Sequence, residues 1–205
     1  MIDQANEEAI KALCYYFTNN PLFEEMRPAA TEENPYPAKY GWRLDKGLLI
    51  QGNVGLGKSL LMSLFSRNKR QCYDVLSSRR ISGQFAELGH EVLHQYAECR
   101  SVPMGDASVF YQRSIGICFD DLGTEEMKKN YGNQVNVMAE VILNRYDNKH
   151  KYGWHCTHVT TNLTMAEIES EYGTRVRSRF TEMFNQIVLH GSDRRKTCKN
   201  ETENT

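Results

Sequence analysis

The feature that most constrains this chain is the stretch IQGNVGLGKSLL, which runs from Ile50 to Leu61. Glycines at positions 52, 55 and 57 are followed at once by a lysine, a serine and an apolar segment. Glycine costs backbone entropy and packs no side chain, so such a cluster is favoured where the backbone turns sharply or approaches another group closely. The run GLLI before it predicts a short buried strand, and SLLMSLFSR after it predicts a helix. The sequence therefore predicts a strand, a glycine-rich turn and a helix in direct succession.

This turn matches the pattern G-x-x-x-x-G-K-[ST], the P-loop or Walker A motif. In such a loop the backbone N–H groups form an anion nest, and the following helix N-terminus adds partial positive charge. We expect Lys58 to contact the β- and γ-phosphates of ATP and Ser59 to bind Mg²⁺. A glycine-rich turn without a ligand is the alternative, and the flanking strand and helix argue against it. The predicted nucleotide-binding residues are Gly52, Asn53, Val54, Gly55, Leu56, Gly57, Lys58, Ser59 and Leu60.

A second short motif, HEVLH from His90 to His94, has the H-E-x-x-H spacing of zinc metalloproteases. The pattern over residues 82–99 predicts one amphipathic helix, on which both histidines lie opposite the apolar stripe. No H-x-x-G-x-x-H extension supplies a third ligand after His94. We interpret the histidines as solvent-facing, with an adventitious surface metal pair as the lesser alternative. The apolar stripe consists of Phe85, Leu88, Val92 and Tyr96.

The length and composition of the chain limit the possible fold, partners and compartment. The 205 residues suffice for one sizeable core, and the net charge of −1 means that any nucleic-acid contact must come from a local basic patch. Six cysteines without a C-x-x-C pair favour free thiols in a reducing compartment. The sequence shows no signal peptide and no apolar stretch that approaches the roughly 18 residues needed to span a membrane. We therefore expect a soluble, cytoplasmic protein without membrane association.

Strands and helices alternate along the chain, which predicts an α/β fold whose parallel sheet is covered by helices on both faces. We expect an N-terminal helical extension and linker over 1–45, an ATP-binding core over 46–191 and a polar tail over 192–205. Tyr40 and Trp42 precede the first core strand, where they either contact a base or ribose or pack on the core. The expected strands are 47–50, 73–78, 114–123, 155–163 and 185–191, and the expected helices are 6–18, 59–67, 82–99, 135–150 and one that a capping box opens at Thr164.

Three further segments carry candidate chemistry. ICFDDLG ends a buried strand in Asp120 and Asp121, of which the first would hold Mg²⁺ and the second would orient or deprotonate the attacking water. VTTN ends another strand in Asn162, whose amide would position that water. RVRSRF places Arg175 and Arg179 on one helix face, where an exposed arginine would serve a neighbouring subunit's nucleotide or simply form surface ion pairs.

In order, these pieces resemble an AAA+ ATPase of the DnaC/IstB-type clade of helicase loaders and transposition helpers. The resemblance covers roughly residues 46–195 and rests on GLLIQGNVGLGKS, ICFDDLGTE, VTTNL, YGTRVRSRF and LHGSDRR. It implies a P-loop NTPase fold of the AAA+ (ASCE) type, with the sensor strand between the P-loop and Walker-B strands. It also implies Asp120 and Asp121 as Walker-B acids, Asn162 as sensor 1 and Arg179 as the arginine finger.

The chain departs from the wider AAA+ pattern at two points. Asp121 stands where a glutamate is usual, which favours slow hydrolysis, and no segment resembles the helical lid domain that carries sensor 2. Arg194 or Arg195 would partly take the place of sensor 2. The resemblance favours an ATP-dependent loader that acts in DNA replication as a homo-oligomer on a replicative helicase. It also implies weak contact with single-stranded DNA through Arg79 and Arg80. The alternatives are an IstB-type transposition helper ATPase and, less favoured, a P-loop kinase.

Overall fold

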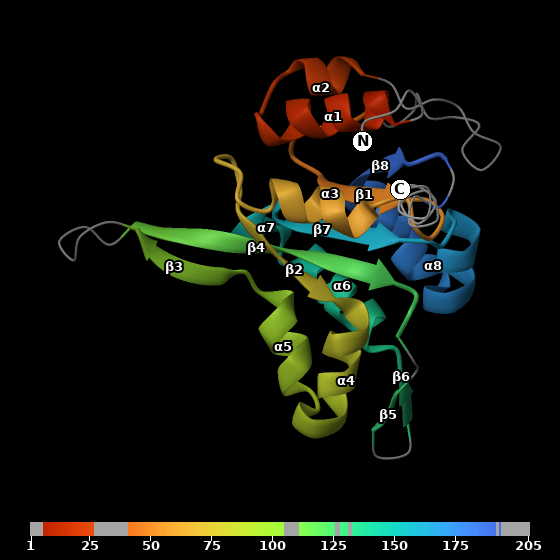
Figure 1. The fold of residues 1–205 in the computed structure, drawn as a ribbon. Coiled ribbons are helices and arrows are strands. Elements are labelled where there is room, and N and C mark those ends of the chain that lie inside the picture. Colours follow the sequence, from red (N-terminus) through yellow and green to blue (C-terminus); the bar gives the residue numbers. More distant parts are fainter. Residues whose placement is uncertain are drawn as a thin grey trace, which may run out of the picture.

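A mostly parallel sheet forms the centre of the computed structural model, which describes residues 6–26, 41–104, 111–125, 128–130, 133–191 and 193 (Figure 1). Within these residues, strands from distant parts of the sequence lie side by side, so the sheet depends on crossover connections. The order across the parallel part is β2 (Tyr73–Ser77), β4 (Tyr111–Leu122), β7 (Thr157–Thr161), β1 (Gly47–Gln51) and β8 (Phe184–Val188). The strand that ends before Asn162, β7, thus lies between the P-loop strand β1 and the Asp120 strand β4, as the family resemblance implied.

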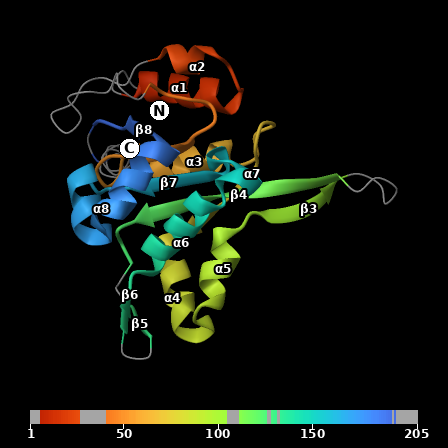
Figure 2. The same ribbon diagram turned by 180° about the vertical axis from the view of Figure 1, so that it is seen from behind.

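Helices cover both faces of this sheet, as predicted (Figures 1 and 2). One face packs against α1 (Glu7–Phe17), α2 (Leu22–Glu25) and α3 (Lys58–Phe65). The other packs against α4 (Ser78–Leu88), α5 (Glu91–Ala97), α6 (Val137–Asp147) and α8 (Met165–Met183), while the short α7 (Lys149–Tyr152) follows α6. None of the helices in these ranges is long and apolar enough to cross a bilayer.

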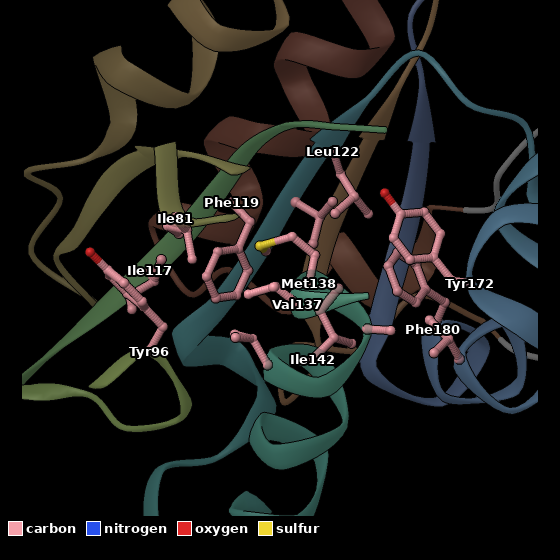
Figure 3. Packing of buried hydrophobic residues seen from close by; sticks show 14 of the residues in the cluster. Ile81, Tyr96, Ile117, Phe119, Leu122, Val137, Met138, Ile142, Tyr172 and Phe180 are labelled. Atoms are coloured by element: carbon pink, nitrogen blue, oxygen red, sulfur yellow. The ribbon is translucent and has the colours of Figure 1, made fainter. Parts of the chain in front are cut away.

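Alternation along β1 divides the core between the two faces. Leu48 and Ile50 are fully buried on the α1–α3 face, and Leu49 is buried on the α4–α8 face. On that second face Phe119 and Ile117 from β4 meet α6 and α4 (Figure 3). Full burial of one such side chain stabilises a fold by roughly 1.5–3 kcal/mol, so these layers fix the position of β1 and of the loop that follows it.

The N-terminal helices are part of this packing. Tyr16 and Phe17 of α1 lie against the sheet, where the Tyr16 hydroxyl donates to the Lys46 carbonyl oxygen at 2.7 Å. Trp42 stacks on Phe23 of α2 and donates from Nε1 to the Gln186 carbonyl at 3.2 Å. Of the two readings of Trp42, core packing is therefore the one that the structure bears out. Tyr40 lies outside the described residues.

Two strand pairs had no counterpart in the sequence-based prediction. β3 (Arg100–Met104) pairs antiparallel with the first half of β4, which extends β4 back to Tyr111 instead of 114. A two-stranded sheet joins β5 (Lys128–Asn130) to β6 (Asn133–Val135). Both pairs contain few consecutive apolar residues, so local hydrophobic patterning gave no signal for them.

The predicted helix over 82–99 is wrong in its extent. The structure has two helices, α4 and α5, and Gly89 separates them with a positive φ of 57°. A glycine with positive φ ends a helix readily, and the new direction of α5 changes which side chains face the core. Leu88, the last residue of α4, is 46% exposed, whereas Phe85, Val92 and Tyr96 are buried as expected. The predicted capping box at Thr164 and Glu167 is confirmed at the start of α8.

Candidate nucleotide-binding site

The loop between β1 and α3 has the backbone that a phosphate-binding loop needs. Gly52, Gly55 and Gly57 all have positive φ, at 144°, 85° and 86°, where any other residue would be strained. Gly57 is the N-cap of α3 and has no side chain to bond the first-turn N–H groups. These N–H groups therefore face the loop as anion donors, reinforced by the helix dipole.

Lys58 links this loop to the sensor strand. Its side chain is buried, and its Nζ donates to the carbonyl oxygens of Gly52 at 2.7 Å and Asn53 at 3.0 Å. It also donates to Asn162 Oδ1, which comes from the end of β7. The structure thus brings together two predicted site residues that are far apart in the sequence. A phosphate that binds here would replace part of this ammonium coordination.

An irregularity in β4 lies at Asp120 and Asp121. The register between β4 and β7 shifts between Phe119 and Leu122, and Asp121 has a left-handed φ of 54°. Such bulges are common beside active sites because they redirect side chains. Thr160 on β7 bridges the bulge: its hydroxyl donates to Asp120 Oδ1 at 2.5 Å and accepts from the Asp121 N–H at 2.9 Å. The threonine thereby fixes the Asp120 carboxylate and the Asp121 backbone.

The same hydrogen-bonding extends along the carboxyl edge of the sheet. Thr161 donates to the Leu122 carbonyl at 2.6 Å and accepts from the Leu163 N–H at 3.0 Å. Gln51 Nε2 on β1 donates to the Leu163 carbonyl at 2.8 Å. Sequence reasoning missed the roles of Thr160, Thr161 and Gln51; two successive threonines before a strand-ending asparagine were the available signal. The network holds the ends of β4, β7 and β1 in fixed relative positions.

The donor set at this edge fits Mg²⁺. Magnesium prefers oxygen ligands, keeps several waters and needs only one or two protein groups besides the substrate phosphates. Asp120 supplies a carboxylate, and Ser59 supplies a hydroxyl from the first turn of α3. Leu60 and Val54 are 63% and 54% exposed. Their side chains have no hydrogen-bonding group, so any hydrogen bond that they donate to a phosphate comes from the backbone N–H.

The predicted arginine finger lies on a different surface. Arg179 on α8 donates from Nη1 to Glu182 Oε1 at 2.9 Å and to the Tyr146 hydroxyl at 3.0 Å, with its guanidinium 4.1 Å from the Tyr146 ring centre. In the part of the chain that the structure describes, these contacts join α8 to α6 and none reaches the P-loop. The hydrogen bond from Tyr146, helped by Arg179, lowers the pKa of Glu182, which keeps this carboxylate ionised. Arg177 pairs with Glu169 at 3.0 Å, and Arg175 is exposed.

The structure also gives the positions of the arginines predicted to contact DNA and of the two motif histidines. Arg79 and Arg80 are exposed in the first turn of α4, directly after β2 and thus at the carboxyl edge of the sheet. His90 and His94 are exposed, as predicted, and no group of three or more potential metal ligands occurs among the residues with described positions. Arg194 and Arg195 lie outside the described residues.

Comparisons with solved structures agree with this geometry. The chain is similar to a crystal structure of the DnaC helicase loader, with 18% identity, 92% of each chain covered and a TM-score of 0.55. It is also similar to a crystal structure of a DNA replication initiation factor, with 12% identity, 99% of this chain covered and a TM-score of 0.57. The chain spans only about half of that second protein, 52% of its length. No protein-family model and no curated protein sequence matches the chain. At these identities the likeness shows the fold alone: the chain shares the fold of the DnaC helicase loader and of the replication initiation factor.

Proposed function

We propose that this chain binds ATP with Mg²⁺ at the loop between β1 and α3 and hydrolyses it slowly within an ATP-dependent homo-oligomer. The observation that carries the proposal is the contact of Lys58 with Asn162, beside the Asp120–Thr160 pair at the ends of adjacent strands. Lysine, carboxylate and amide thus converge at one edge of the sheet. A P-loop NTPase needs these groups around the γ-phosphate.

Each residue has a distinct role in this proposal. Lys58 exchanges loop carbonyls for β- and γ-phosphate oxygens, while Ser59 and Asp120 hold the magnesium ion that neutralises developing charge. Asp121 accepts a proton from the attacking water, and Asn162 orients that water. Arg179 from a neighbouring subunit stabilises the transferred phosphoryl group.

For the biological role, we propose loading of a replicative helicase during DNA replication, in the cytoplasm. The ICFDDLGTE and RVRSRF motifs support this role, and so does the likeness to the DnaC helicase loader. The exposed Arg79 and Arg80 at the sheet edge offer phosphate contacts for single-stranded DNA, which would be weak and sensitive to salt. ATP-dependent co-elution of the chain with the replicative helicase of its host tests the role, and the loader assignment is wrong if the two never co-assemble.

Lys58→Ala tests nucleotide binding. Loss of the ammonium removes the main side-chain partner of the phosphates, and charge-assisted hydrogen bonds are strong, so ATP affinity should fall by about 10²-fold or more. Isothermal titration with ATP and MgCl₂ measures this. Lys69→Ala removes an exposed lysine elsewhere and should bind like the parent. If Lys58→Ala binds ATP as tightly as the parent, the assignment of the loop is wrong.

Asp121→Asn tests hydrolysis separately from binding. The amide keeps the shape of the side chain but accepts a proton from water far less readily, so ATP affinity should stay within about threefold while turnover falls by at least about 10²-fold. Phosphate release under ATP saturation measures turnover. Asp147→Asn, an exposed acid at the end of α6, is the matched control. Turnover at the parent rate in Asp121→Asn would remove the proposed base.

A further inference from the structure

The segment after β8 follows the phosphate-binding loop closely. The Leu189 N–H donates to the Gln51 carbonyl at 2.8 Å, and a Cβ on Gly52 would lie 2.6 Å from the Leu189 carbonyl oxygen. Two residues further on, a Cβ on Gly191 would lie 3.6 Å from a methyl group of Leu56. Successive contacts therefore hold this segment along the loop rather than at a single point.

Asp193 continues this path onto the centre of the loop. A Cβ on Gly55 would lie only 1.9 Å from Asp193 Oδ1 and 2.3 Å from its Cγ. The carboxylate therefore occupies the space directly above the Gly55 α-carbon, and the side chain is partly buried there. Gly55 is required both for its φ of 85° and for the room that it leaves to this carboxylate.

We propose that Asp193 is a built-in antagonist of nucleotide binding, because its carboxylate lies against the loop that collects the phosphates. The inference rests on the proposed function, namely that ATP binds at this loop. Backbone N–H groups and the α3 dipole attract any anion, whether a phosphate or a side-chain carboxylate. The triphosphate must either displace Asp193 or tolerate a like charge beside it, and both weaken ATP binding.

The contact also links the nucleotide site to the end of the fold. Two events that compete for one loop are coupled reciprocally. ATP binding displaces Asp193 from Gly55, and any force that draws Asp193 away from the loop raises ATP affinity. The segment thereby acts as an autoinhibitory contact that lowers occupancy of the isolated chain. Its strength depends on the charge of Asp193 rather than on the shape of the side chain.

Asp193→Asn tests this directly, since it removes the charge and keeps the size. Isothermal titration should show that ATP binds about three- to tenfold more tightly than to the parent, that ADP gains less, and that adenosine gains nothing. The gain should shrink in about 0.5 M NaCl, because salt screens exposed charges. Glu87→Gln, an exposed acid on α4, should leave all these affinities unchanged. Asp193→Ser serves as a second variant if the asparagine variant folds poorly.

The possible failures are distinguishable. Unchanged ATP affinity in Asp193→Asn, while Lys58→Ala loses binding, overturns the inference and leaves the proposed function standing. Weaker ATP binding in Asp193→Asn also overturns it and makes the carboxylate a nucleotide ligand. If neither the parent nor Asp193→Asn binds ATP, the proposed function and the inference fail together.

Discussion

Two short motifs of similar specificity, G-x-x-x-x-G-K-S and H-E-x-x-H, lie in very different places in this molecule. In the P-loop, Lys58 is buried and donates to the side chain of Asn162, which directly follows β7. The histidine motif begins at His90, the N-cap of α5, and continues to His94 in that helix, and both of its histidines are exposed. One motif lies where several elements meet, and the other lies on an outer surface.

The comparison shows that a motif acquires chemistry from the topology around it. Parallel strands end at one edge, so the side chains that follow β1, β4 and β7 reach a common site without local sequence contacts. A helix pair on the outside of the sheet offers no such convergence. An arginine whose proposed partner is another subunit tests this difference, and so do a buried histidine and the two exposed histidines of the motif.

Arg179→Ala should have the largest effect. A guanidinium supplied to a neighbour's nucleotide contributes about 10³-fold or more in related phosphoryl-transfer systems. We therefore expect ATP affinity near that of the parent and turnover lower by about 10³-fold. Arg179 is held by Tyr146 and Glu182, so the measurement should be accompanied by thermal unfolding to separate lost catalysis from lost stability.

Mixing separates action within a chain from action between chains. Arg179→Ala mixed with Asp121→Asn should regain part of the activity, because some interfaces then combine an intact Asp121 site with an intact Arg179. Arg177→Ala is the matched control, since that arginine pairs with Glu169 within α8, across the kink at Gly173. No recovery in co-assembled mixtures, or parent turnover in Arg179→Ala, rejects the finger assignment and makes Arg175 the next candidate.

The sequence predicted the elements of the site better than their contacts. GLLI and VTTN mark β1 and β7 because buried parallel strands are almost continuously apolar or β-branched. The contact of Lys58 with Asn162 and that of Asp193 with Gly55 join residues more than 100 positions apart, so no local pattern predicts them. The order of the strands was predicted from the family resemblance, not from the local pattern. The break at Gly89 was not predicted, because the regular spacing of apolar residues over 82–99 favoured one continuous helix despite the single glycine.

The buried histidine His158 should make the stability of the fold depend on pH, which is a smaller effect than the loss of turnover in Arg179→Ala. His158 on β7 is fully buried, accepts the Leu48 N–H at Nδ1 at 3.1 Å and packs edge-on near the Tyr73 ring. Burial lowers the pKa of His158 well below its usual range. As the pH falls below about 6.5, the unfolded chain gains a proton that the folded chain does not, so stability decreases.

Urea unfolding at pH 7, 6 and 5 measures this loss. In His158→Gln the residue cannot gain a proton, so the decrease in stability from pH 7 to 5 should be measurably smaller than in the parent, whatever the stability of the variant at pH 7. Gln95→Ala changes an exposed residue that does not titrate and should keep the parent's pH dependence. Equal pH dependence in parent and His158→Gln would contradict the prediction.

The smallest effect should come from the histidine motif itself. His90 and His94 offer two exposed ligands, whereas a tight zinc site needs three or four that converge. The His90→Ala, His94→Ala double variant should keep the parent ATPase rate. It should lose about 0.5–1 kcal/mol of stability, because both side chains are exposed and His90 has one edge-on contact, with Phe85. Gln95→Ala, on the same helix, is the control for a general change of this surface.

Metal analysis of the purified parent should find no stoichiometric zinc. One tightly bound zinc per chain that disappears in the double variant would show that this motif has chemistry of its own, and the contrast with the P-loop would fail.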